Sequence, residues 1–377
     1  MNAATNLPGR EAAVPASRTS RALTRDEVEA FGAELDALRS EVMASLGERE
    51  ATYIRNVQAI VRYTEIGGRG LLILGWLPPA WLAGTGLLAF SKIVDNMELG
   101  HNVMHGQYDW MNEPALRGDT YEWDHACDGD AWRHSHNYMH HAFTNVEGRD
   151  RDIGYGMLRL CDAQPWQPLH LLQGIGALTL ATLFQWGIAL HDLEVDEALR
   201  GRVALDELVR KSGPALTKIA RQFAKDYVVF PVLAGPSFVP VLAGNAVANL
   251  LRDLWTFGII FCGHFTADAE TFPPSVLDGE TRGAWYVRQV RGSSNLTGGP
   301  VFHFLTGNLS HQIEHHLFPD VPAVRYADMA PRVRETCARY EQNYNTGSFW
   351  SQFVTVLARI VKYSFPTWPA AAPAAAR

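Results

Sequence analysis

Nine of the 14 histidines gather in three short motifs and at one isolated position, and their spacing indicates metal binding. Each motif contains two histidines four residues apart, which share one face of a helix and direct two rings toward one point. Two motifs add a histidine directly after the pair. Neutral imidazole binds metal near neutral pH without first losing a proton. The candidate ligands are His101, His105, His136, His140, His141, His264, His311, His315 and His316.

The number of histidines predicts two metal ions. Structural zinc sites close at four ligands, and catalytic zinc keeps three from the protein. Magnesium and calcium prefer oxygen ligands, so a set built from imidazole with open positions favours redox iron. One such pair arises by chance on many helices, but three pairs, two of them extended, indicate a metal centre.

The composition favours a chain that is partly in a membrane. Charged residues make up 19% of its 377 residues, against about 25% in soluble domains, and 11 Trp with 12 Tyr suit a bilayer interface. A mean hydropathy of -0.10 requires a large polar part as well. The net charge of -7 argues against nucleic-acid binding. The four dispersed cysteines give no support for a disulfide framework or a fused iron-sulfur centre.

Four apolar runs are candidates for contact with a bilayer, at about 70–90, 169–190, 227–242 and 244–265. Pro78 and Pro79 interrupt the first run, which predicts a helical hairpin whose second arm leads directly to His101. The alternative for this run is a single kinked span. Either arrangement places the first histidine motif at a boundary between membrane and water.

A parity condition constrains the remaining runs. All metal-binding histidines must reach one metal pair, so between His141 and His264 the chain can cross the bilayer only an even number of times. The last two runs satisfy this condition as a hairpin, because Gly235 and Pro240 interrupt the stretch between them. The run at 169–190 is then interfacial or re-entrant. Alternatively, it spans the bilayer and the last two runs form one bent helix.

The histidine motifs resemble those of the membrane fatty acid desaturases, in particular the bacterial acyl-CoA and acyl-lipid desaturases. The resemblance extends over about residues 71–366 and rests on HNVMHGQYDWMN, WRHSHNYMHHAFTNVEGRDRDIGYG, FCGHF and GNLSHQIEHHLFP. It implies a non-haem di-iron centre that uses dioxygen to remove two hydrogens from an alkyl chain. It assigns ligation to all the candidate histidines except His311, because the related motif Q-x-x-H-H places Gln312 at that position.

These observations predict an all-α integral membrane protein, with helical hairpins that span the bilayer and a cytoplasmic helical cap that holds the di-iron site. Basic residues in the 192–226 segment favour the cytoplasmic side, and the expected location is a bacterial inner membrane. Three regions are predicted: 1–50, a disordered tail to about Arg21 and an amphipathic helix; 51–366, the desaturase domain; and 367–377, a disordered tail. Thr24 and Glu27 form a capping box at the start of the helix.

The predicted function is oxygen-dependent desaturation of an acyl-CoA or acyl-lipid. The alternative is a di-iron membrane hydroxylase of alkyl or lipid substrates, which the product distinguishes. A non-catalytic metal transporter is disfavoured, because the motifs lie on one membrane face. No H-P-G-G or C-x-x-C motif is present, so electrons must come from a separate donor, a ferredoxin or a flavin/iron-sulfur reductase. The expected partners are thus a fatty acyl substrate, this donor and membrane lipid.

Other residues are expected to assist the site. Trp255, Phe257, Phe261 and Phe265 are candidates for the lining of an acyl tunnel, although aromatic residues of this kind more often belong to a hydrophobic core. The carboxylates expected to orient imidazole rings are Asp95, Glu98, Asp150, Asp152 and Glu314, while Asn295 and Asn308 would orient a metal-bound water. A basic stripe of Arg288, Arg291, Arg325, Arg332, Arg334 and Arg339 would dock CoA phosphates or an acidic donor; the alternative is a solvated surface balanced by Asp328, Glu335 and Glu341.

Overall fold

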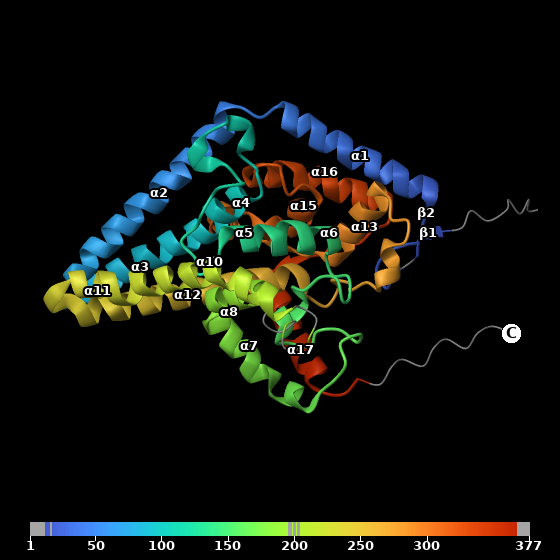
Figure 1. Ribbon diagram of the computed structural model, residues 1–377. Coiled ribbons are helices and arrows are strands. Elements are labelled where there is room, and N and C mark those ends of the chain that lie inside the picture. Colours follow the sequence, from blue (N-terminus) through green and yellow to red (C-terminus); the bar gives the residue numbers. More distant parts are fainter. Residues whose placement is uncertain (1–11, 16, 195–197, 199–200, 202–203, 368–377) are drawn as a thin grey trace, which may run out of the picture.

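The computed structural model describes residues 12–15, 17–194, 198, 201 and 204–367, and almost all of its regular structure is helical. The all-α class predicted from the sequence is therefore confirmed. Two long helical hairpins meet at one end of the molecule, and a cap of shorter helices occupies the other end (Figure 1).

The first hairpin consists of α2 (Glu48–Ile73) and α3 (Pro78–Val94). Pro78 is the first residue of α3. Proline has no backbone N–H, but an N–H at this position would make no intrahelical hydrogen bond, and the fixed φ of proline suits a helix. The arms approach closely at Gly68 and Gly84, since a Cβ on either would lie 2.9 Å from the backbone oxygen of the other. The hairpin predicted from the proline pair is confirmed.

The second hairpin has an outgoing arm of several segments and a return arm of one long helix. Its parts are α10 (Leu205–Ala224), the π-helix η7 (Lys225–Val229), α11 (Phe230–Leu233), the 3-10 turn η8 (Gly235–Ser237) and α12 (Phe238–His264). The predicted arms have the wrong bounds. The break ends at Ser237, because Pro240 fits the first turn of α12 and Gly244 lies within that helix against Leu72.

The run at 169–190 is not a straight helix. It forms η6 (Pro168–Leu172), α7 (Gln173–Thr182) and α8 (Phe184–Asp192), and the chain bends by 98° between the η6–α7 part and α8. By length and composition, only Gly235–His264 among the described helices is suited to cross a membrane alone, and the bent pair would add a second candidate. The hairpin topology is thus present, while its relation to a bilayer belongs to the proposal below.

Buried charges join the hairpins to the cap. The side chain of Asp226 on η7 is 0% exposed and lies 2.8 Å from Nζ of Lys92, whose side chain is 1% exposed. Arg69 of α2 also reaches Asp226, at 3.4 Å, and Lys92 lies 3.3 Å from Asp124 in a loop of the cap. A buried charge without a partner is costly, so these pairs hold α2, α3, η7 and the cap loop in one arrangement.

The cap is built from short helices and two short sheets. Its helices are α1 (Arg25–Ala44), η1 (Asp95–Gly100), α4 (His101–Met104), η2 (Asp109–Met111), η3 (Pro114–Leu116), α5 (Gly129–Trp132), η4 (Arg133–His140), α6 (His141–Phe143), η5 (Ile153–Gly156), η9 (Pro274–Leu277), α13 (Arg282–Gly292), α14 (Pro300–Leu305), η10 (Leu309–His311), α15 (Gln312–Leu317), η11 (Ala323–Arg325), α16 (Tyr326–Arg339) and α17 (Phe349–Ser364). Strand β3 (Asn295–Thr297) pairs in parallel with β4 (Thr346–Ser348), next to the third histidine motif.

The N-terminal segment is more ordered than its composition predicts. Ala12–Val14 forms strand β1, which pairs antiparallel with β2 (Leu23–Thr24). The predicted capping box of α1 is confirmed, because the backbone N–H of Thr24 donates to Glu27 at 2.8 Å and the Thr24 hydroxyl caps the helix in return. Expectations for residues 1–11 and 368–377 lie outside the described residues.

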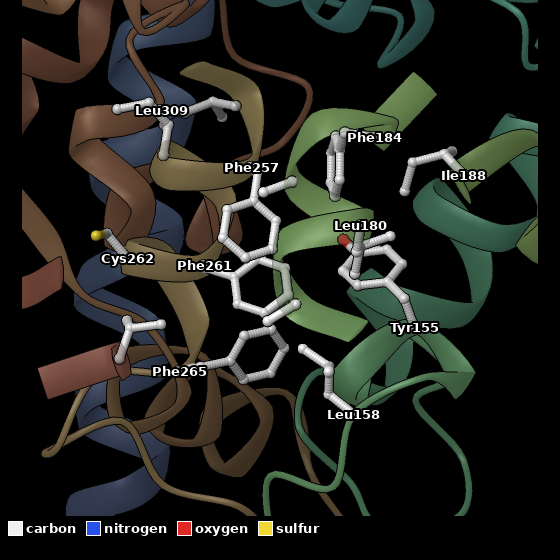
Figure 2. Close-up of a cluster of buried hydrophobic side chains, with 14 of the residues drawn as sticks. Tyr155, Leu158, Leu180, Phe184, Ile188, Phe257, Phe261, Cys262, Phe265 and Leu309 are labelled. Carbon is white, nitrogen blue, oxygen red and sulfur yellow. The ribbon is translucent and has the colours of Figure 1, made fainter. Parts of the chain in front are cut away.

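Two hydrophobic cores position the cap. One joins α1 to α13 and α16, where Phe31, Tyr286 and Val333 are fully buried. The other joins α12 to α7 and α8, and Figure 2 shows Phe257 and Phe261 of α12 facing Phe184 and Leu180 across it. The helix that ends in a candidate ligand, α12, is therefore fixed along its side by packing.

Candidate metal centre

Four separate segments supply the clustered histidines. The first motif forms α4 and follows the π-helix η1, the second occupies the π-helix η4 and α6, and the third lies in α15. His264 is the last residue of α12. π-Helices are rare and occur mostly at functional sites. Two of them stand directly at the histidine motifs.

The structure brings eight of the nine candidate histidines into one cluster. Ring nitrogens of His101, His105, His136 and His315 lie within 4.8 Å of one another, and so do those of His140, His264 and His316. His141 forms a third such group with His315 and His316. The group of His101, His105, His136 and His315 shares no residue with the group of His140, His264 and His316, which fits two metal ions held side by side.

The nitrogens that face the cluster fit a metal. The Nε2 atoms of His105, His136, His141 and His315 are buried and have no hydrogen-bond partner among the described residues. The Nε2 atom of His264 lies 3.3 Å from that of His140 and 3.1 Å from that of His316. Buried polar atoms in a native protein are almost always satisfied, so lone pairs that converge in this way indicate a bound cation.

Burial keeps these imidazoles in the form that binds metal. Desolvation, with repulsion from His136, lowers the pKa of His101 to about 3. Desolvation also lowers the pKa of His105 and of His315 well below the ordinary histidine value. Neutral imidazole has a free lone pair, so these three rings need no proton removal before coordination. His140 differs, because burial is outweighed by the nearby carboxylates, Asp150 above all, which raise its pKa.

Several Nδ1 atoms donate to fixed acceptors, and this orients the opposite nitrogen toward the cluster. Nδ1 of His140 lies 3.0 Å from Asp150, as the sequence predicts for a carboxylate beside the motif. The other acceptors are Asn102 for His101 at 3.1 Å, Gln289 for His316 at 3.0 Å and the Tyr326 hydroxyl for His315 at 3.4 Å. The sequence analysis missed these three residues, because neutral polar side chains have no characteristic spacing.

The other predicted carboxylates have different partners. Asp152 lies 3.8 Å from Nδ1 of His136 and 3.2 Å from Nε2 of His191. Two of the remaining carboxylates bond to the asparagines that were expected to hold a water: Glu98 accepts from Asn308 at 2.9 Å, and Glu314 accepts from Asn295 at 2.8 Å. Asp95 accepts from the backbone N–H of Asp124. Asp95, Glu98 and Glu314 thus brace the chain around the ligands.

His311 is not brought to the cluster. It lies in the 3-10 turn η10, and α15 begins only at Gln312, so His311 and His315 do not share the face of one continuous α-helix. Its ring stacks on His303 at a centroid distance of 4.6 Å. The amide nitrogen of Gln312 instead lies 2.9 Å from Nε2 of His264. The related motif Q-x-x-H-H placed Gln312 where the histidine spacing placed His311, and it is Gln312 that faces the cluster.

Replacing Asp150 by asparagine is expected to weaken metal binding by about 10–100-fold, because a carboxylate partner fixes the ring of His140 and raises its basicity. Competition with a chelator of known affinity measures the change. Asp268→Asn, at an exposed carboxylate four residues after His264, is the matched control and should leave affinity unchanged. Equal affinities for the two variants would contradict the orienting role of Asp150.

A cavity borders the first histidine group. His101 and His136 form part of its wall together with Trp132, which stacks on His136 at 4.5 Å. The apolar part of its wall is formed by Met97, Tyr155, Phe184, Ile188, Ile260 and Leu309, and polar side chains such as Ser135 and Asp192 contribute as well. An apolar chain lying in this cavity would contact the metal-binding rings directly.

The four aromatic residues considered for an acyl tunnel belong to the hydrophobic core instead. Phe257 and Phe261 stack on each other at 4.0 Å, and Phe265 continues the row within the closed core of Figure 2. The indole N–H of Trp255 donates to the backbone oxygen of Leu305. None of the four lines the cavity, because the neighbouring face of α12, with Ile260, turns toward it.

The basic stripe is neutralised rather than free. Arg332 pairs with Glu41 at 2.8 Å and Arg339 pairs with Glu34, so carboxylates of α1 cover cations of α16. Of the other members, Arg325 pairs with Glu50, Arg288 with Glu280, Arg291 donates to Gln342, and Arg334 lies over the ring of Tyr344. The pairs to Glu41 and Glu34 favour a structural role for Arg332 and Arg339, which hold α1 against α16.

Comparisons with known proteins identify related chains. The model of the family described as fatty acid desaturase matches residues 74–348. The NADPH-dependent stearoyl-CoA 9-desaturase of Mycobacterium tuberculosis is 43% identical over 348 residues, which cover 91% of this chain and 82% of the relative. The sn-1 linoleoyl-lipid 6-desaturase of Synechocystis is 27% identical over 307 residues, covering 73% of this chain and 81% of the relative.

Proposed function

The chain belongs to the fatty acid desaturase family, and from this premise we propose that it is an oxygen-dependent oxidoreductase that introduces a carbon-carbon double bond into a fatty acyl chain. The observation that carries the proposal is a cavity with a mostly apolar wall that is bordered by His101 and His136 of the histidine cluster. Such a site would place an alkyl chain beside one of the proposed metal positions.

The cofactor proposed is a pair of iron ions. His101, His105, His136 and His315 would hold one ion, and His140, His264 and His316 the other, with His141 next to both His315 and His316. Bound iron with dioxygen as co-substrate would supply the oxidising power to remove two hydrogens from unactivated methylene groups. The chain itself would orient the ligands through their Nδ1 acceptors and exclude bulk water from the cavity.

The proposed substrate is a long-chain acyl-CoA. This choice rests on the relative that is 43% identical, whose name specifies stearoyl-CoA, whereas the acyl-lipid desaturases compared are less than 30% identical.

The name of the same relative specifies NADPH, which supports a separate NADPH-oxidising donor with flavin or iron-sulfur centres. An NADPH-linked donor is cytoplasmic in bacteria, so the cap would face the cytoplasm.

The hairpins would insert into a bacterial inner membrane with their turns leading. The two turns lie together, since the indole N–H of Trp76 donates to the backbone oxygen of Pro236 at 3.0 Å. Trp76 and Leu77 at one turn, and Leu233 at the other, are large exposed apolar residues. The second hairpin lies between His141 and His264 and returns to the cap, so the chain would cross the bilayer an even number of times there, as the parity condition requires.

An assay with stearoyl-CoA, NADPH, a flavin/iron-sulfur reductase and dioxygen tests the proposed function. Gas chromatography with mass spectrometry should find an alkene that requires oxygen and is absent with the His140→Ala variant. An alcohol as the sole product would instead establish a hydroxylase. Double-bond position follows from derivatisation of the product.

Replacing His311 by alanine is expected to leave two iron ions bound and most of the activity intact, because its ring stacks on His303 outside the cluster. Iron content per chain and initial rates measure this. His316→Ala is the comparison, since His316 belongs to the same motif and lies inside the cluster. A loss of iron from His311→Ala equal to that from His316→Ala would place His311 among the ligands.

A further inference from the structure

The C-terminal helix α17 has two contrasting faces. Val356 and Ile360 on the inner face are buried in the core shared with α12 and α7. The outer face carries large apolar side chains that are 45% to 72% exposed: Trp350, Val354, Leu357, Val361 and Phe365. Their spacing of three and four residues makes one continuous stripe along the helix.

Helix α7 extends this apolar surface. It contacts α17, and both helices pack against α12, as Figure 1 shows on the side of the molecule where α7 lies. Ile175 and Leu178 of α7 are each 64% exposed. Exposed apolar residues that occur singly are normal, but a contiguous patch across two helices marks an interaction surface.

The charges around this apolar patch indicate that it contacts lipid. Neither α7 nor α17 contains an aspartate or glutamate, and α17 carries Arg359 and Lys362, the latter exposed beside the stripe. Cations at the edge of an apolar face suit an anionic lipid surface, and a tryptophan at the helix start suits the headgroup level. Both α7 and α17 pack against α12, the helix suited to cross a membrane.

We propose that α17, together with α7, lies in the plane of the bilayer surface with its outer stripe buried among lipid acyl chains. The protein then has a second lipid contact besides the hairpin turns. α17 escapes a search for spans because it is too short, and its apolar residues recur with a helical period instead of forming a continuous run. Its inner face binds it to the core, so α17 is held at the lipid surface by the fold.

The four native cysteines are all buried, so single introduced cysteines can carry a fluorescent label in the full chain. Val354→Cys and Val361→Cys report on the stripe. Leu77→Cys at the hairpin turn reports on membrane insertion, and Ala30→Cys on the exposed face of α1 is the aqueous control. Each labelled protein is reconstituted in vesicles of phosphatidylcholine and phosphatidylglycerol, with or without nitroxide-labelled lipid.

Nitroxide lipid is expected to quench the labels at 354 and 361 several-fold more than the label at 30, with iodide in the water giving the reverse order. Quenching at 77 but iodide access at 354 and 361 would overturn the role of α17 while leaving insertion intact. Labels at 354 and 361 shielded from both quenchers would assign the stripe to a second copy of the chain and overturn the lipid contact.

Discussion

Replacing His315 by alanine should reduce desaturase activity by more than about 100-fold and lower the iron content of the purified protein. Loss of an outer residue that merely orients a ligand already costs about 10–100-fold. His315 belongs to two of the histidine groups, one with His101, His105 and His136 and one with His141 and His316. Its removal would take one ligand from the first proposed ion and would also change the surroundings of His141 and His316. Metal analysis together with single-turnover product yield measures the effect.

His170→Ala is the matched control for this variant. His170 lies in η6, outside the histidine cluster, and its Nδ1 accepts from the backbone N–H of Gln167. It should keep its iron and its activity. Circular dichroism and gel filtration establish that both variants are folded. Full iron content and activity in His315→Ala would show that the cluster is not the metal centre.

Replacing Asp226 by alanine is expected to lower the free energy of unfolding by about 3–5 kcal/mol, which is typical when one partner of a buried ion pair is removed. The variant leaves Lys92 in a buried position with only the partly exposed Asp124 as a counter-charge. Denaturant unfolding in detergent, followed by intrinsic fluorescence, measures the loss. An exposed pair would contribute at most about 1 kcal/mol.

The double variant Asp226→Leu with Lys92→Met separates loss of charge balance from loss of packing. Replacing a whole buried pair by apolar residues is often close to neutral, so the double variant should be more stable than Asp226→Ala. A smaller recovery is expected than for an isolated pair, since Arg69 also faces Asp226. If the double variant is less stable than Asp226→Ala, the ion pair is not the source of the destabilisation.

Local spacing predicted those parts of the fold and site that depend on the period of a helix. The i, i+4 pairs identified the histidines of the first two motifs that gather in the cluster, and the proline pair identified the turn before α3. His311 has the same spacing from His315 but lies outside the histidine groups, because η10 is a 3-10 turn, where side chains follow a different period. Spacing predicts a shared face only if the helix type is known.

The sequence does not indicate contacts between residues that lie far apart in the chain. Gln289 and Tyr326 reach metal-binding rings from α13 and α16, and neither has a neighbour in the chain that indicates the contact. The sequence left open whether the arginines of α16 form a free basic surface, because their partners Glu34 and Glu41 lie about 300 positions away on α1. The sequence also does not show which face of α12 its neighbours cover, so it could not show that Ile260 rather than Phe257 or Phe261 lines the cavity.

The π-helix at the second motif makes the length of that segment critical. A π-helix holds more residues per turn than an α-helix, so deletion of one residue within Arg133–His140 would restore the ordinary pitch. The wider turn takes up the extra residue, so side chains outside the segment would keep nearly the same faces. A deletion between His136 and His140 would instead shorten their separation to three residues, so the two rings could not both keep their present directions in the cluster. Substitutions within this segment are therefore more tolerable than changes in its length, a constraint that matters for grafting the motif onto another scaffold.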